Sequence, residues 1–380
     1  MIGGKLNEAD QVFEEILKSN PKHIYALLGR AEIALRRDRL EEAEKEVRQA
    51  LSINSKAPEA HNMMGLVLFR KEKLGDATVE FQEAIRLNPK FTTPRMYLAD
   101  IYLVEKKSDL AISEYKSVIQ IDPSLPTAHV DLANVYLKMG SKEQAIKVLE
   151  EWKNQDPKNP EASTVLGETY VTLHEYDKAL SEFDAVLKIN PKLPSALRNK
   201  GDAYSLMGNY PKAIEFYKEA IQANPKYIEP LMRLGTLYDQ LGKPAEAISS
   251  FRQAISADPT FPPPYNNIAW LFVREGKDLD EALELVKKAI ELDPKYADAY
   301  DTMGWILFSK GDYKDAIKTL KQARDLNHDQ PETLAHLGMA YYKEGMRKEA
   351  LETLKKALAL KKDIQDASTI QKIIAELDKE

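Results

Sequence analysis

The 380-residue chain contains no cysteine, which excludes disulfides, thiolate metal sites and cysteine nucleophiles. Glycine is scarce, at 16 residues, and there are only three tryptophans. No apolar run approaches the roughly 18 residues that a membrane-spanning helix needs, and no secretory signal opens the chain. The net charge of −6 argues against general nucleic-acid binding. The remaining composition, rich in Ala, Leu, Glu and Lys, favours an all-helical chain that is long enough for several domains or a repeat array.

An Asn or Asp recurs at intervals of 34 residues, and proline follows it in most copies. One extra residue lies between the eighth and ninth copies, within residues 276–280, where we expect a turn. A residue before proline is pushed out of the helical region, and Asn or Asp side chains hydrogen-bond nearby backbone. Each copy therefore predicts a firm helix end. The ten copies are Asn20, Asn54, Asn88, Asp122, Asp156, Asn190, Asn224, Asp258, Asp293 and Asn327.

Small and bulky side chains return at fixed places within each interval. One place holds alanine in every copy: Ala43, Ala77, Ala111, Ala145, Ala179, Ala213, Ala247, Ala282, Ala316 and Ala350. The fullest single copy reads Leu231, Leu234, Gly235, Tyr238, Ala247, Phe251 and Pro259. This pattern resembles the tetratricopeptide repeat, a pair of helices joined by a tight turn. The resemblance implies an all-α fold, a right-handed α-solenoid of helix-turn-helix units with a C-terminal capping helix.

The repeat positions predict three regions. Residues 24–364 hold ten repeats that start near 24, 58, 92, 126, 160, 194, 228, 262, 297 and 331. Proline opens six of them, at Pro58, Pro126, Pro160, Pro194, Pro262 and Pro331, where its missing N–H costs nothing. Residues 1–23 are expected to be the second helix of a truncated repeat, and residues 365–380 a capping helix. The N-terminal half-repeat leads us to expect a fragment of a longer protein.

Catalytic and metal-binding patterns are missing from the sequence. The six histidines do not combine into a ligand set, and His336 is expected to face the groove without a second ligand nearby. There is no phosphate-binding loop, dinucleotide fingerprint or nucleophile elbow. We therefore expect no enzyme activity, no cofactor and no metal. Trp152 stands where most repeats have a small residue, and Ser163 in the next repeat is unusually small, which favours a packing exchange.

The first helix of each repeat is expected to line an extended concave groove. One position on it can be followed along the chain, as Glu32, Leu66, Asp100, Asn134, Glu168, Asp202, Thr236, Trp270, Trp305 and Met339. The middle of this row is acidic, at Asp100, Glu168 and Asp202. Its C-terminal end is aromatic, because Trp270 and Trp305 are joined by Phe308 and Tyr342 near Met339.

Exposed aromatic patches mark binding sites, and tryptophan is an enriched anchor. The alternative is that Trp270 and Trp305 pack on each other or on neighbouring repeats. The resemblance implies that polar side chains close by hold the backbone or carboxylate of a bound peptide. These are Asn266, Asn267, Arg233, Arg198 and Asn199. The predicted peptide-binding groove consists of these five residues and of Asp100, Glu168, Asp202, Trp270, Trp305, Phe308, Met339 and Tyr342.

The predicted function is a non-enzymatic scaffold that binds a protein or peptide, without nucleic acid or membrane insertion. Residues 265–271 and 301–307 resemble the C-terminal units of bacterial tetratricopeptide proteins of envelope assembly, secretion and exopolysaccharide export. That similarity implies a soluble protein of the bacterial cytoplasm, periplasm or envelope. Two alternatives stay open: head-to-tail self-association into a filament or ring, and a targeting arm cut from a larger enzyme.

Overall fold

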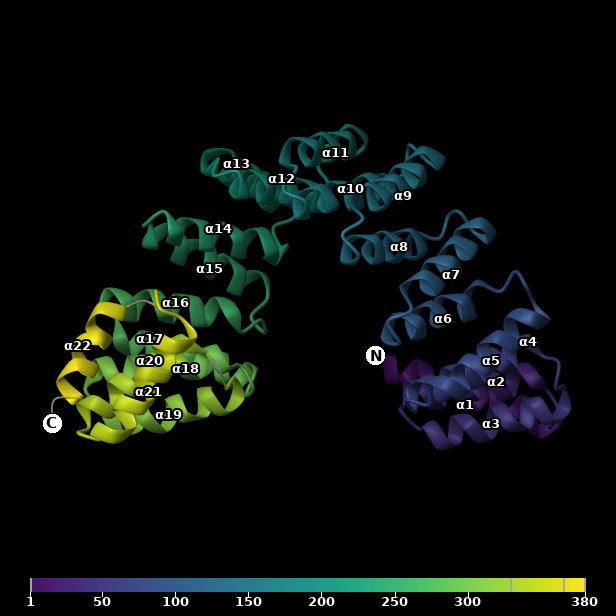
Figure 1. The fold of residues 1–380 in the computed structure, drawn as a ribbon, viewed down its shortest axis with the longest axis horizontal. Coiled ribbons are helices and arrows are strands. Elements are labelled where there is room, and N and C mark those ends of the chain that lie inside the picture. The colour runs from purple at the N-terminus through teal and green to yellow at the C-terminus, as the bar shows by residue number, and fades with distance from the viewer. Residues whose placement is uncertain (1, 329, 365, 379–380) are drawn as a thin grey trace. The chain divides into compact units, whose positions relative to one another are not determined.

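The computed structural model describes residues 2–328, 330–364 and 366–378, and every regular element within these residues is an α-helix. The chain divides into an N-terminal body, Met1–Leu173, and a C-terminal body, His174–Glu380, which are described separately. Figure 1 shows the helices stacked as antiparallel neighbours within each body. The prediction of an all-α solenoid of tetratricopeptide units is confirmed. Residues 365, 379 and 380 of the predicted cap lie outside the described residues.

The helices of the N-terminal body are α1 (Ile2–Ser19), α2 (Ile24–Arg36), α3 (Leu40–Ile53), α4 (Pro58–Arg70), α5 (Leu74–Leu87), α6 (Thr92–Val104), α7 (Ser108–Ile121), α8 (Pro126–Lys138), α9 (Lys142–Gln155) and α10 (Pro160–Thr172). Those of the C-terminal body are α11 (Tyr176–Ile189), α12 (Pro194–Leu206), α13 (Tyr210–Ala223), α14 (Ile228–Gln240), α15 (Pro244–Ala257), α16 (Pro263–Glu275), α17 (Leu279–Leu292), α18 (Ala297–Lys310), α19 (Tyr313–Leu326), α20 (Pro331–Lys343), α21 (Arg347–Leu360) and α22 (Ala367–Leu377).

The recurring Asn or Asp ends the second helix of each repeat, as its sequence context predicts. At Asn88, for example, the backbone is extended, with φ −135° and ψ 92°. Its side-chain oxygen accepts a hydrogen bond from the N–H of Lys90 at 3.2 Å. The same bond, at 2.8–3.3 Å, forms at Asn20, Asn54, Asp122, Asp156, Asn190, Asn224, Asp258 and Asp293. This side-chain turn replaces the next helical hydrogen bond and so stops the helix.

The extra residue of the eighth repeat lies in the turn between α16 and α17. Gly276 and Asp278 both adopt left-handed backbone conformations there, with φ of 64° and 49°. Pro262 precedes α16 in a helical conformation, and the helix itself begins at Pro263. The insertion therefore falls between helices, where it leaves their pairing intact.

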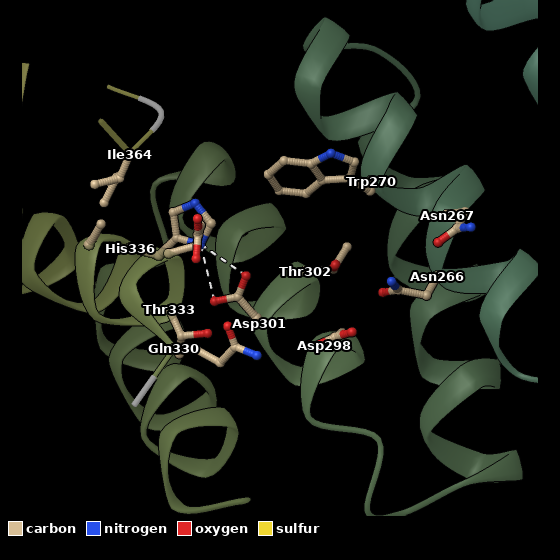
Figure 2. A pocket seen from close by; sticks show the side chains of 12 residues that line it. Asn266, Asn267, Trp270, Asp298, Asp301, Thr302, Gln330, Thr333, His336 and Ile364 are labelled. Carbon is tan, nitrogen blue, oxygen red and sulfur yellow. Dashed lines mark hydrogen bonds and ion pairs between the residues drawn. The ribbon is translucent and has the colours of Figure 1, made fainter. Parts of the chain in front are cut away.

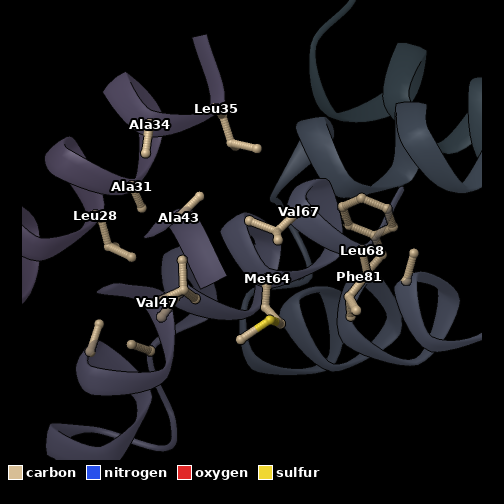
Figure 3. Close-up of a cluster of buried hydrophobic side chains, with 14 of the residues drawn as sticks. Leu28, Ala31, Ala34, Leu35, Ala43, Val47, Met64, Val67, Leu68 and Phe81 are labelled. Carbon is tan, nitrogen blue, oxygen red and sulfur yellow. The ribbon is translucent and has the colours of Figure 1, made fainter. Parts of the chain in front are cut away.

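Each helix pair approaches closely at a small residue of its first helix. A Cβ added to Gly235 would lie 2.5 Å from the ring of Phe251, and one added to Gly65 would lie 2.5 Å from Phe81. Figure 3 shows the resulting core of α2–α5, in which Val47, Met64 and Phe81 fill the space between paired helices. The small residue lets the paired helices pack at short range, and the aromatic ring fills the seam.

The first helices of the repeats also contact one another within each body. In the N-terminal body α2 contacts α4, α4 contacts α6, and α8 contacts α10. In the C-terminal body α12 contacts α14, and α16, α18 and α20 contact in succession. Because neighbouring helices approach most closely on the inner side of a curved stack, these even-numbered helices line that inner side.

Two local features complete the packing. Trp152 is only 3 % exposed and stacks on His129, with ring centroids 5.2 Å apart, so it packs in the core, while the exchange with Ser163 remains a prediction. At the other end, α22 contacts α20 and α21 and buries Ile370 and Leu377 against them. No helix among the described residues is long and apolar enough to cross a membrane.

A candidate binding pocket in the C-terminal body

A pocket of about 340 Å³ lies between α16, α18 and α20, the first helices of three successive repeats. Its lining combines one indole with many polar groups. Figure 2 shows Trp270 on one side of the space, with the amide of Asn266 pointing into it. The lining residues are Asn266, Asn267, Trp270, Asp298, Asp301, Thr302, Gln330, Glu332, Thr333, Ala335, His336 and Ile364.

Two of the three carboxylates in the lining are already engaged by partners. The His336 Nδ1–H donates to both carboxylate oxygens of Asp301, at 3.0 and 3.1 Å. Lys361 Nζ donates to Glu332 Oε1 at 2.8 Å, and this bond lowers the pKa of Glu332. These pairs fix the side chains on the α20 side of the pocket.

The third carboxylate, Asp298, is held differently. Among the described residues none donates a hydrogen bond or offers a cation to it. Its pKa is raised, first because the surrounding protein desolvates it and second because the charge of Asp301 is close. Asp298 is therefore an unneutralised acceptor at the exposed rim of the pocket.

Asn266 provides a second unused acceptor. Its side chain is 7 % exposed, and its Oδ1 has no hydrogen-bond partner within the described residues. The same side chain hydrogen-bonds Tyr296, whose pKa is raised to about 12, chiefly by burial. A buried carbonyl oxygen without a donor costs free energy, and Asn62 at the equivalent repeat position of the N-terminal body has the same unpaired oxygen.

The aromatic side chains beside the pocket form a stack. The Trp305 ring lies between His336, with centroids 4.3 Å apart, and Phe308, at 4.6 Å. Trp270 stands apart from this stack, 6.0 Å from His336 and tilted by 39°. Trp305 therefore packs within the protein, whereas Trp270 lines the open space. Both indoles are half-buried beside the core of the C-terminal body, and a binding role for either remains a prediction.

The other predicted groove residues fall outside the pocket. Asp202 accepts hydrogen bonds from Tyr217 at 2.7 Å and Arg198 at 2.9 Å, and Arg233 lies 3.4 Å from it. Asn199, on the same helix α12, is buried. These side chains form a polar network of α12–α14, and the charge of Asp202 is neutralised within it.

Four further predicted residues have separate surroundings. Met339 is buried among apolar side chains of α20 and α21, and Tyr342 donates a hydrogen bond to Glu376 of α22 at 2.8 Å. In the N-terminal body, Asp100 accepts a hydrogen bond from Tyr115 at 3.0 Å, and Glu168 is exposed on α10. The structure brings together only Asn266, Asn267 and Trp270 of the predicted groove residues as lining of this pocket.

Several lining residues were not predicted from the sequence, although the helical register contains a signal for two of them. Asp301 and Ala335 stand four residues before Trp305 and Met339, as Asn266 does before Trp270. Residues four apart share a helix face, so the row extends by one turn toward the helix start. Gln330 and Ile364 lie outside helices and follow no such register.

Five of the six histidines have hydrogen-bond partners within the protein: His23, His61, His129, His174 and His336. His61 and His129 share one repeat position, and each ring Nε2 lies near a carbonyl oxygen of the preceding turn, at 3.0 Å from Ser55 and 2.9 Å from Pro123. Tyr265 and Tyr300 donate hydroxyl hydrogen bonds to the equivalent turns. No group of three or more His, Asp or Glu side chains in the described parts of the chain could hold a metal ion.

Comparisons with family models cover both bodies. Models described as tetratricopeptide repeat match residues 2–67, 62–126, 105–168 and 160–193. The model of the cilia and flagella-associated protein 70 C-terminal domain matches residues 180–377. No curated protein matches the chain.

Solved structures are similar to the chain at low sequence identity. The anaphase-promoting complex hetero-tetramer Cut9-Hcn1 matches with 16 % identity and a TM-score of 0.51, over 92 % of this chain and 75 % of that chain. A tetratricopeptide repeat protein from Parabacteroides merdae has 18 % identity and a TM-score of 0.49, over 67 % and 98 %. YrrB, a tetratricopeptide protein described as having an unusual peptide-binding site, has 22 % identity and a TM-score of 0.40, over 49 % and 95 %.

The matches to repeat models extend without a gap from residue 2 to residue 193, and the ciliary model continues to residue 377. The helix pairs, the side-chain turns and the small-residue contacts repeat along the same stretch. The chain belongs to the tetratricopeptide repeat family.

Proposed function

We propose that the chain is a non-enzymatic scaffold that binds a protein or peptide through the pocket between α16, α18 and α20. The observation that carries the proposal is the pocket itself, which Trp270 lines together with three carboxylates, and in which Asp298 has no hydrogen-bond donor within the described residues. A concave site with one aromatic wall and a few polar groups is typical of ligand recognition. Its place on three successive first helices suits an extended segment of a partner.

A library of displayed random peptides tests this function, because selection from it does not require the partner to be identified first. Peptides enriched on the intact chain are measured against the Trp270→Ala variant by titration calorimetry. We expect the affinity to fall about tenfold or more, because truncating an aromatic anchor costs over 1 kcal/mol. Equal affinity for both proteins, or no enrichment at all, would contradict the proposal.

The choice of Trp270 alone follows from the packing of its neighbour. Trp305 is stacked between two rings, so we expect Trp305→Ala to lower the melting temperature. A loss of affinity in that variant could then result from unfolding and not from the loss of a ligand contact. Tyr25→Ala is the matched control, since Tyr25 is 66 % exposed in the N-terminal body. The melting temperature of Trp270→Ala is measured beside the affinities.

The cellular setting is a separate part of the proposal. The similarity of residues 265–271 and 301–307 to bacterial envelope and secretion proteins supports a prokaryotic partner. The ciliary family model matches the same repeats and gives that assignment no support. Self-association is the other open alternative, and a mass that stays that of a monomer over a wide concentration range in light scattering would exclude it.

A further inference from the structure

Two repeats carry the same tyrosine–aspartate pair between their two helices. Tyr217 donates a hydrogen bond to Asp202 at 2.7 Å in the C-terminal body, and Tyr115 donates one to Asp100 at 3.0 Å in the N-terminal body. No other repeat has aspartate and tyrosine at these two positions. In each pair the hydroxyl group of the second helix therefore holds one carboxylate of the first helix in place.

The pair in the C-terminal body binds cations from within the chain. Arg198, one turn before Asp202 on α12, donates a hydrogen bond to it at 2.9 Å. Arg233, on the first helix of the next repeat, lies 3.4 Å from the other carboxylate oxygen. The tyrosine–aspartate pair is thus a guanidinium site in this protein, and here its two cations are built in.

The N-terminal body has the same pair without the cations. Met96 stands where α12 has Arg198, and Asp131 stands where α14 has Arg233. A second carboxylate therefore replaces a guanidinium beside Asp100. Within residues 2–173 neither of these two carboxylates forms an ion pair.

The surroundings make an unpaired charge costly but leave it accessible. Burial raises the pKa of Asp100. Burial first and the charge of Asp100 second raise the pKa of Asp131, and Lys138 on the same helix offsets only part of this. Both aspartates are only half-buried, so a ligand can reach them from solvent. Met96 and Val104, one turn before and one turn after Asp100 on α6, offer apolar surface to the alkyl stem of a cationic side chain, and Val104 is 64 % exposed.

We propose that Asp100 and Asp131 bind the guanidinium of an arginine side chain from a partner protein, in the place that guanidinium groups of this chain fill in the C-terminal body. A guanidinium has five donors in one plane and can donate to two carboxylates at once. A lysine ammonium has three donors on a compact, more strongly hydrated charge and suits two acceptors less well. The site goes beyond the proposed function, because it lies in the N-terminal body and requires no contact with Trp270.

Methionine methyl groups labelled with ¹³C allow a direct assay. Met96 reports on the site beside Asp100, and Met346, which packs in the C-terminal body, is an internal control. The probes are blocked tripeptides, acetyl-Gly-X-Gly-amide, in which X is arginine, lysine or citrulline, the uncharged planar analogue of arginine. We expect the arginine peptide to shift the Met96 signal saturably and to leave the Met346 signal in place. Citrulline should bind about tenfold more weakly or worse, and lysine should bind more weakly than arginine.

Replacing Asp131 by the residue type of the C-terminal body tests the internal comparison without a peptide. Asp131→Arg should raise the melting temperature, because it supplies a cation to Asp100, and it should abolish the Met96 shift. Asp131→Asn, which removes the charge without adding a cation, should weaken arginine binding about tenfold. Glu150→Arg makes the same change of charge on the exposed side of α9 and should alter neither property.

Equal binding of arginine and citrulline, equal binding of arginine and lysine, or no saturable shift at millimolar peptide would each overturn the inference. So would undiminished arginine binding by Asp131→Arg, or a melting temperature of Asp131→Arg no higher than that of Asp131→Asn. Trp270→Ala should leave the Met96 shift unchanged, so failure at this site is distinguishable from failure of the proposed pocket.

Discussion

At the end of each repeat, one Asn or Asp side chain both stops a helix and starts the following turn. The extended backbone at Asn88 ends α5, and its side-chain oxygen receives the N–H of Lys90. Seven residues after that Asn or Asp position, a donor such as His129 or Tyr265 reaches the turn carbonyl. Buried polar groups at the turn are thus satisfied by side chains close in sequence.

His129 makes the stability of the N-terminal body sensitive to pH. It is 1 % exposed against Trp152, and burial lowers its pKa below the value of the unfolded chain. Below pH about 6.5 the unfolded chain therefore binds the proton more readily than the folded chain. The contribution of neutral His129 to the free energy of unfolding is fully present above that pH. It is lost as the pH falls toward the lower pKa of the folded state.

The measurement compares melting temperatures at pH 7 and pH 5 for the intact chain and for His129→Gln, which cannot be protonated. We expect the intact chain to lose more stability on acidification, by at most about 1.4 kcal/mol per pH unit. His174→Gln, at an exposed histidine, is the control and should behave like the intact chain. An identical pH dependence in His129→Gln and the intact chain would show that His129 does not contribute.

At the scale of the helix pair, most aromatic rings of the second helix face a glycine of the first helix, and Tyr115, which faces Ala99, is the exception. Gly65, Gly201 and Gly235 each lie against an aromatic ring of the second helix. Ala31, Ala133 and Ala269 occupy the same place in repeats whose second helix has Val47, Leu149 or Val286 instead. The summed volume at this contact is therefore similar in most repeats, as close packing requires.

Gly235→Ala should destabilise the chain even though alanine favours helices. The added methyl group would press on Phe251, at a cost of about 1–3 kcal/mol, and about 1 kcal/mol of helix propensity offsets part of it. Adding Phe251→Leu should reduce the cost of the alanine, which a double-mutant cycle in urea measures. Gly75→Ala, in open space on α5, should stabilise by up to about 1 kcal/mol. If Gly235→Ala stabilises as much as Gly75→Ala, the contact with Phe251 does not limit the size of the residue at position 235.

The helices could be predicted from the sequence more fully than the candidate binding pocket. The 34-residue period, the prolines at first positions and the small residues predict helix pairs because each acts locally. The pocket depends on side-chain partners across helices, such as His336 with Asp301, and on residues outside helices, such as Ile364. Periodicity assigns a face to Trp305 but does not reveal that rings cover both of its sides. The division into ten repeats with the predicted starts remains a prediction.

At the scale of the whole molecule, a stack of repeats has no single core, so each end of a body exposes a surface that an inner repeat would cover. In the C-terminal body α22 covers α20 and α21, and Ile370 and Leu377 are buried by this contact. Its opposite side, with Gln371 and Lys372, is exposed. Helix α22 thus covers the apolar surface of the pair α20 and α21 and presents a polar surface to the outside.

Deleting residues 366–380 should destabilise the C-terminal body by about 3 kcal/mol or more, since two buried aliphatic side chains contribute about 1.5–3 kcal/mol each. The exposed apolar surface of α20 and α21 should also promote association. Denaturation in urea measures the first effect, and light scattering measures the second. The control variant Gln371→Ala/Lys372→Ala keeps the helix, and it should match the intact chain. A deletion variant as stable and as monomeric as the intact chain would contradict the covering role.

The size matching inside each pair also limits how such a gene can change by recombination. An exchange between copies with crossover points at the Asn or Asp breaks moves a whole pair, so Gly235 travels with Phe251 and Ala269 with Val286. A crossover in the turn within a pair would join a first helix with Ala269 to a second helix with Phe251, and of the ten repeats only the third, with Ala99 and Tyr115, combines alanine with an aromatic ring at these positions. Duplication and loss of repeats should therefore be inherited in whole modules, with breakpoints clustered at the proline-marked joints.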